Sequence, residues 1–222
     1  MNFSYESLPT QWVWIAGALY GVTMAWVLWR APWSWLRERE HLHVFLGSCV
    51  ALLLMWSMRA SAIPGLDYHY LGATLTTLMF GWRLACVALC LVLAGTVFNG
   101  ASDWQVFPMN ALTMVLTPVL LSHAIFRVVD SRLPNNIFVY IFVCGYFGAG
   151  AALLGAGGLT SILLVRGGVY SFERLAYDYF PFAPLMLFME AFITGMLVAI
   201  FVVMRPNWVS TFDDARYLKR RP

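Results

Sequence analysis

The stretch "YLGATLTTLMFGWRLACVALCLVLAGTVF" (residues 70–98) decides how the fold is interpreted, because it is almost wholly apolar but contains one arginine. A single straight helix over this stretch would place Arg83 near the middle of a bilayer, where a charged side chain is costly. We therefore expect two short helices, over about 69–81 and 84–98, separated by a turn at Gly81-Trp82-Arg83. The chain reverses direction at this turn.

The composition of the whole chain is that of a membrane protein. Of its 222 residues, 61% are hydrophobic and 11% are charged, and the mean hydropathy is +0.72. A soluble domain carries about a quarter charged residues, so most of this surface must face lipid. We expect an all-α, polytopic helix bundle in one integral membrane domain over residues 1–205, followed by a short basic cytoplasmic tail over 206–222. The net charge of +3 is too small to argue for nucleic acid as a partner.

The remaining apolar runs supply further spans, since a helix needs roughly 20 apolar residues to cross a bilayer. They cover 11–29, 43–58, 108–129 with a kink at Pro118, a segment from about Asn136 that is rich in small residues, and 180–204. With the two helices above, this makes about seven spans. The two termini are then expected on opposite sides of the membrane.

The basic residues predict which side is which. Most of the 14 Lys and Arg residues fall in the loops and tail on one side, and such an excess is typical of the cytoplasmic side. The N-terminus is therefore expected outside and the C-terminus in the cytoplasm. The residues assigned to the cytoplasmic side are Arg30, Arg37, Arg39, Arg83, Arg127, Arg132, Arg205, Arg216, Lys219, Arg220 and Arg221.

One histidine stands at the outer end of the third span, in "DYHYLG" (residues 67–72). The neutral imidazole of His69 can bind a borderline metal such as nickel, cobalt or zinc, and Asp67 lies two residues ahead of it. The alternative is an interfacial histidine that caps a helix. A single ligand does not define a metal site, so both interpretations remain open at this point.

Two other polar residues lie in apolar surroundings. Glu190 is a carboxylate deep inside a span, and acids in such positions face the bundle interior or a cavity. It is either functional or a structural acid that locks its helix to a polar neighbour such as Asn110. Asn110 itself either caps the start of its helix or lines a polar pocket, and we expect the cap.

Other candidate groups are interpreted as structural. Cys86 and Cys90, at i and i+4, are able to bind copper, but buried packing is the better interpretation. The segment "REREHLH" is expected to be a solvated charged loop, and His123 is expected to be structural. The pairs Gly145–Ala149 and Ala151–Gly155 allow close helix approach, either within this chain or between copies, and we favour packing within the chain.

Three motifs in order resemble the cobalt/nickel energy-coupling-factor permeases of the CbiM type, the membrane-embedded substrate-capturing subunits of a class of ABC importers. They are "PGLDYHYLGATLTTLMFGW" (64–82), "FPMNALTM" (107–114) and "MEAFITGMLVAIFVVMRP" (189–206). The resemblance implies no catalytic activity and no tightly bound cofactor, with the divalent metal as transported substrate. It also implies a bacterial or archaeal plasma membrane location, with a coupling transmembrane protein and ATPase subunits as partners.

The resemblance further implies a metal site of nitrogen donors at the outer face. Its donors are the N-terminal amine, a backbone amide, a histidine at the second position and the histidine that corresponds to His69. Here the second residue is Asn2, so one imidazole is missing and nickel or cobalt binding should weaken. The expected metal ligands are His69, Met1 and Asn2, with Asp67 as an additional carboxylate, while Asn110 and Glu190 form the polar interior.

Two alternatives belong to other classes. One is a family member that has lost metal capture and serves as a structural or assembly subunit of another membrane complex. The other is a membrane redox subunit, in which His43 and His123 would bind a haem.

Overall fold

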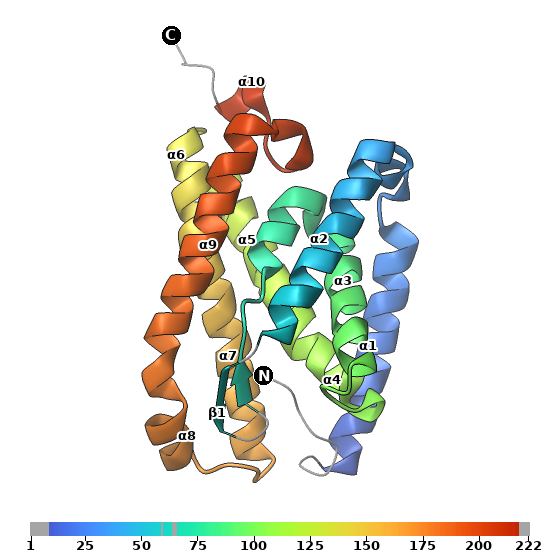
Figure 1. The fold of residues 1–222 in the computed structure, drawn as a ribbon, viewed down its shortest axis with the longest axis vertical. Helices are drawn as coiled ribbons and strands as arrows, with labels where there is room; N and C mark the ends of the chain where they lie inside the picture. The colour runs from blue at the N-terminus through green and yellow to red at the C-terminus, as the bar shows by residue number, and fades with distance from the viewer. Residues whose placement is uncertain (1–8, 59, 64–65, 218–222) are drawn as a thin grey trace.

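The computed structural model describes residues 9–58, 60–63 and 66–217. Figure 1 shows helices that run side by side along one axis, and six of them within the described ranges are long and apolar enough to cross a membrane. They are α1 (Thr10–Arg30), α2 (Arg39–Ser57), α3 (Ala73–Phe98), a helix that ends in α5 (Thr117–Arg132), one that ends in α7 (Gly148–Arg166), and one that ends in α9 (Ala183–Met204).

Three of these six spans are built from more than one helical element. The small α4 (Phe107–Ala111) leads through a π-helical stretch into α5, and α6 (Ile137–Val139) leads through another into α7. The short α8 (Phe172–Asp178) precedes α9, and α10 (Asp214–Tyr217) follows it. Strands β1 (Ala60–Ile63) and β2 (Leu66–Tyr68) form an antiparallel pair between α2 and α3.

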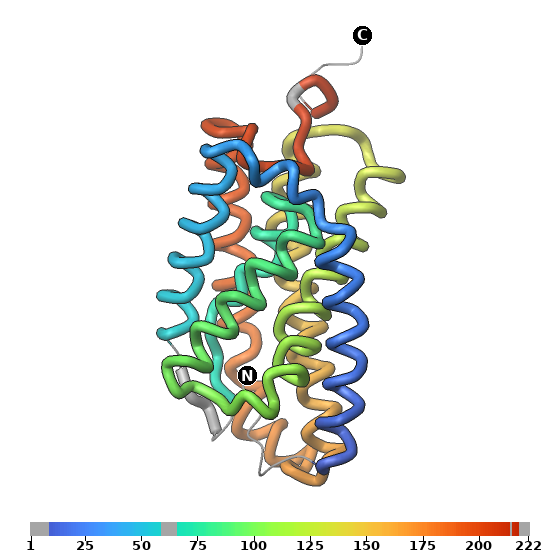
Figure 2. Tube along the Cα trace, turned by 90° about the vertical axis from the view of Figure 1, so that its right-hand side faces the viewer, coloured from blue at the N-terminus to red at the C-terminus, as the bar shows by residue number. Residues whose placement is uncertain are grey.

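Helix α3 is broken at Gly81, whose backbone has φ 74° and ψ 156°. The first arm (residues 73–80) and the second arm (residues 82–98) run in opposite directions along the bundle, as Figures 1 and 2 show. The predicted turn is confirmed, and it lies at Gly81 because only glycine adopts this backbone conformation readily. With α3 counted as two arms, the described chain passes along the bundle seven times.

Arg83 lies directly beyond this break. Its guanidinium group is 4.7 Å from the ring centroid of Trp82 and 5.6 Å from that of Trp26. Both distances suit cation–π attraction. The arginine is therefore placed where the chain reverses, against two aromatic rings.

Replacing Gly81 by alanine is expected to lower the free energy of unfolding by about 1–3 kcal/mol, the usual magnitude of strain in this backbone region. Space does not limit the substitution, because the nearest atom to an added Cβ is the Ser210 hydroxyl at 3.9 Å. Denaturant unfolding of the detergent-solubilised protein measures the effect. Gly47→Ala in α2, where nothing lies within 4 Å of the added Cβ, is the control, and equal stability of the two variants would contradict this account.

The first arm of α3 is capped at its far end by the segment that follows α9. The backbone N–H of Ser210 donates to the Met79 carbonyl at 2.8 Å, and the Thr211 hydroxyl donates to the Leu78 carbonyl at 2.7 Å. These bonds satisfy carbonyls that the end of a helix leaves unpaired. Farther along, Arg216 forms an ion pair with Asp130 at 2.7 Å, so residues 206–217 fold back onto the bundle.

Two local expectations are wrong. Helix α2 begins at Arg39, so much of "REREHLH" is helical, and His41 stacks on Trp35 with ring centroids 3.9 Å apart. Asn110 does not cap a helix: α4 begins at Phe107, and Asn110 lies inside it with its side chain buried. In both places the helix starts earlier than the apolar pattern indicates, because a first turn tolerates polar residues and proline.

The other boundaries agree more closely with the sequence. Asn136 caps α6, where its side-chain oxygen accepts from the Phe138 N–H at 2.8 Å. A π-helical stretch at Leu112–Leu116 ends two residues before Pro118, the position of the predicted kink. Helix α9 ends at Met204, just before Arg205 and Pro206.

The small residues of the helix over Ile137–Arg166 pack within the chain. An added Cβ at Gly145 would lie 3.4 Å from Val198 on α9, and one at Gly155 would meet the Leu121 side chain on α5. The glycines therefore allow α5 and α9 to approach this helix closely. Packing within the chain is confirmed for these two glycines.

Candidate functional site

The segment that contains His69 is held firmly although it is not helical. Residues 66–72, here called the His69 segment, comprise β2 and the stretch that leads from it into α3. Leu66, Tyr68 and Leu71 are all buried. The Tyr68 hydroxyl donates to the Tyr179 carbonyl at 2.9 Å, and the two rings stack with centroids 4.4 Å apart. Burial raises the pKa of Tyr68 to about 12, so its hydroxyl remains a neutral donor.

His69 itself is half-buried and lies against Trp56 of α2, with ring centroids 4.7 Å apart. Its Nδ1 is 3.2 Å from the Tyr70 carbonyl. A carbonyl can only accept, so this contact assigns the proton of a neutral ring to Nδ1 and the lone pair to Nε2. That tautomer is the usual arrangement of a metal-binding histidine with an oriented ring.

Trp56 also holds the backbone of the His69 segment. Its side chain is 2% exposed, and its indole N–H donates to the Leu71 carbonyl at 3.2 Å. The same side chain therefore supports the imidazole and the peptide two residues farther along. Nothing in the sequence marks Trp56 for this role, since it is one of ten tryptophans and belongs to a different span.

Glu190 of α9 completes the attachment. The side chain is 3% exposed, with Oε2 accepting from the Leu71 N–H at 2.7 Å and Oε1 from the Gly72 N–H at 2.9 Å. The partners of this carboxylate are thus backbone amides at the start of α3. One turn farther along α9, the hydroxyls of Thr194 and Tyr70 are 2.9 Å apart.

The other expected site residues are placed differently. Asp67 is half-buried in β2, while Met1 and Asn2 lie outside the described residues. Asn110 is fully buried, and its amide donates to the Ser102 hydroxyl at 3.0 Å. Among the described residues, no three His, Cys, Asp or Glu side chains are grouped to hold a metal. A set of four donors at His69 therefore requires other groups as well.

The remaining sulfur and imidazole groups have packing roles. Cys86 and Cys90 are buried, and the Tyr20 hydroxyl lies 3.8 Å from the Cys90 sulfur. The ring of His123 is 5.9 Å from that of Trp82. These contacts agree with the structural interpretation of the three residues.

Helices broken within the bundle, like α3 here, are found in membrane transport proteins. Two solved structures share the fold. One, described as a transition metal transporter, has a TM-score of 0.74, with 18% identity over 91% of this chain and 93% of its own. The other, a truncated transition metal transporter, has a TM-score of 0.78, with 16% identity over 91% and 99%.

A family model decides the assignment. The CbiM model, described as the cobalt uptake substrate-specific transmembrane region, matches residues 2–208, and the chain belongs to this family. It is a multi-pass integral membrane protein of a cobalt or transition-metal uptake system, a transporter subunit and not an enzyme. A comparison with curated protein sequences finds no match.

Proposed function

We propose that this chain captures a divalent metal of the cobalt and nickel class, with the imidazole of His69 as a ligand. The observation that carries the proposal is the anchored state of His69. Its ring lies against Trp56, and the peptides that follow it are bonded to Trp56 and Glu190. A ligand held this rigidly is preorganised, and preorganisation favours tight binding.

The further donors would come from the amino end of the chain and from the His69 segment. We propose the amine and backbone amide of Met1 and Asn2, with Asp67 as an additional carboxylate. Asn2 stands where the family resemblance implies a histidine, so one imidazole nitrogen would be replaced by a weaker amide oxygen. Because oxygen donors suit harder cations, we expect weaker nickel and cobalt binding than a complete nitrogen set would provide.

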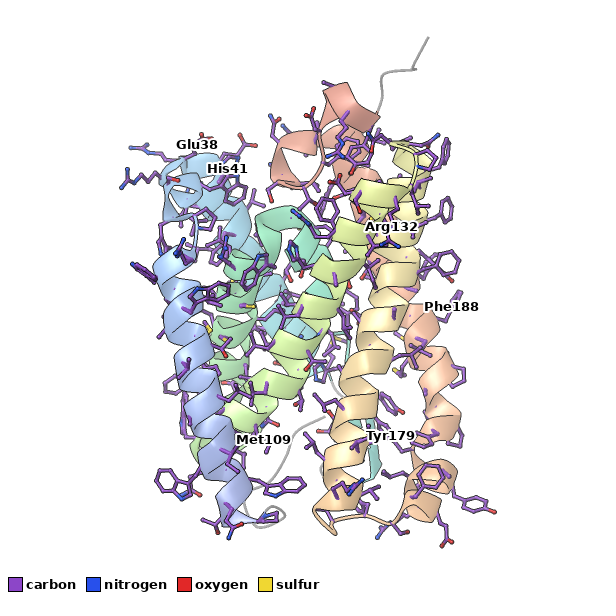
Figure 3. All side chains as sticks on the ribbon, turned by 180° about the vertical axis from the view of Figure 1, so that it is seen from behind. Glu38, His41, Met109, Arg132, Tyr179 and Phe188 are labelled. Carbon is purple, nitrogen blue, oxygen red and sulfur yellow. The ribbon has the colours of Figure 1, made fainter. Side chains whose placement is uncertain are left out.

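The proposed orientation puts the His69 segment on the outer side. Figure 3 shows Glu38, His41 and Arg132 toward one end of the bundle and Tyr179 and Met109 toward the other. Of the arginines in the described part of the chain, only Arg166, at the end of α7, and Arg174, within α8, lie on the Tyr179 side. The positive-inside rule then favours a cytoplasmic location for the end that contains Arg132.

We propose that this chain works with a coupling membrane protein and ATPase subunits. Uptake against a gradient needs an energy source, and in energy-coupling-factor importers that source is ATP hydrolysis by partner subunits. The basic end of the bundle, which includes Arg127, Arg132 and Arg205, is the side proposed to face them.

Replacing His69 by alanine is expected to weaken binding of Ni²⁺ and Co²⁺ at least about a hundredfold, because loss of an outer-shell partner alone costs 10–100-fold. Titration calorimetry of the purified protein measures this, with wild type expected at micromolar affinity or tighter. His43→Ala, an exposed histidine of α2, is the matched control and should bind as wild type does. Equally flat titrations of wild type and His69→Ala with Ni²⁺, Co²⁺, Zn²⁺ and Cu²⁺ would favour a structural or assembly subunit instead.

A further inference from the structure

Helix α9 and the residues after it hold the first arm of α3 at both ends. At the start of the arm, the Glu190 carboxylate accepts from the Leu71 and Gly72 amides. At the far end, Ser210 and Thr211 bond to the Met79 and Leu78 carbonyls. Helix α9 and the residues after it therefore fix both ends of the arm, including the end into which the His69 segment leads.

Leu71 is the point where this placement reaches the histidine. Its N–H donates to Glu190 on α9, and its C=O accepts from Trp56 on α2. A residue bonded on both sides in this way cannot rotate its flanking peptides without breaking a buried hydrogen bond. His69 is only two residues away from Leu71. The Nδ1 atom of its ring is bonded to the carbonyl of Tyr70, the residue between them.

The two bonds of Glu190 also act as a pair. They reach successive amides, at 2.7 and 2.9 Å, with one carboxylate oxygen each. Successive amides point toward the same acceptor only when the backbone turns at the residue between them, which here is Leu71. The carboxylate therefore selects the turned conformation of the segment over an extended one.

From this geometry we propose that Glu190 is a positioning residue for His69, which fixes the direction of the imidazole toward the captured metal through the peptides of Leu71 and Gly72. The inference rests on the proposed function for the metal, but the placement of the ring is a property of the metal-free protein as well. Glu190 would therefore orient the ligand His69 without binding the metal itself.

Two substitutions separate this role from a general contribution to stability. In Glu190→Gln, one oxygen is replaced by an NH₂ group, which cannot accept from an amide, so one bond of the pair is lost. Glu190→Asp keeps the carboxyl group but is one methylene shorter and cannot reach both amides. Ser122→Ala removes a buried hydroxyl that lies 2.7 Å from the Thr74 hydroxyl. It is the control for loss of a buried hydrogen bond to the same arm of α3 that does not involve the Leu71 and Gly72 amides.

The first measurement uses Ni²⁺ and Cu²⁺ on the purified full chain. Glu190→Gln is expected to weaken Ni²⁺ binding about tenfold or more, as loss of an outer-shell partner does, and to change the Cu²⁺ electron paramagnetic resonance spectrum. Glu190→Asp should give a change of the same kind, because it too loses at least one of the two bonds. Ser122→Ala should leave both affinity and spectrum as in wild type, even if its unfolding midpoint falls equally.

The second measurement needs no metal. Diethyl pyrocarbonate modifies accessible imidazoles, and mass spectrometry reads His69 separately from the exposed His43 in the same molecule. The rate at His69 relative to His43 is expected to rise several-fold in Glu190→Gln and not in Ser122→Ala.

The outcomes distinguish the two proposals. If wild type binds metal through His69 and Glu190→Gln matches it in affinity and spectrum, the positioning role is overturned and metal capture stands. If wild type binds no metal, capture fails, and the relative modification rate decides the positioning role: a rise supports it and an unchanged rate overturns it.

Discussion

Replacing Gly72 by valine is expected to abolish metal capture and to lower the free energy of unfolding by about 2–6 kcal/mol. Gly72 has φ 67°, where a β-branched residue is strained by about 1–3 kcal/mol. An added Cβ would also meet the Leu52 side chain and lie 3.0 Å from Tyr70, and overpacking of a core costs a further 1–3 kcal/mol or so. Relief of the strain would move the His69 segment away from Glu190 and Trp56.

Denaturant unfolding and Ni²⁺ calorimetry on the same preparation test this prediction. Gly21→Val in α1 is the matched control, because Gly21 is helical and an added Cβ there meets nothing within 4 Å. A Gly72→Val protein as stable as Gly21→Val, with Ni²⁺ affinity intact, would show that the segment has no need of this backbone conformation.

Replacing Trp56 by alanine is expected to destabilise the protein by about 3–5 kcal/mol, the usual cost when a buried tryptophan is truncated. The side chain is 2% exposed, and its removal also takes the donor from the Leu71 carbonyl and the ring support from His69. Metal affinity should fall together with stability. Both are measured by unfolding in detergent and by Ni²⁺ titration.

A graded pair of variants separates packing from hydrogen bonding at this position. Trp56→Phe keeps an aromatic ring near His69 but loses the indole N–H and part of the ring volume, so it should cost about 1–3 kcal/mol, less than Trp56→Ala, with affinity largely kept. Trp14→Ala, which removes a side chain that is 76% exposed on α1, should change neither quantity. If Trp56→Ala behaves as Trp14→Ala does, Trp56 has no supporting role.

The contrast between Arg83 and Glu190 shows how far sequence reasoning reaches. Both are charged groups in apolar runs. The position of Arg83 within an apolar run indicates that the helix must break near it. The structure has this break in α3 at Gly81, two residues before Arg83. The partners of Glu190 lie 118 and 119 residues away, and no periodicity within α9 identifies them, so Asn110 was considered as a neighbour instead.

The sequence alone determined the properties that depend on how each segment interacts with the lipid bilayer. The cost of a charge inside a bilayer predicted two arms around Gly81, and the apolar runs predicted a polytopic helical membrane protein. Tertiary structure decided which segments meet. The attachment of His69 depends on Trp56 from α2 and Glu190 from α9, which reach Leu71 from two sides. Such contacts arise from the packing of helices that are far apart in the chain, and the local sequence of each helix does not predict them.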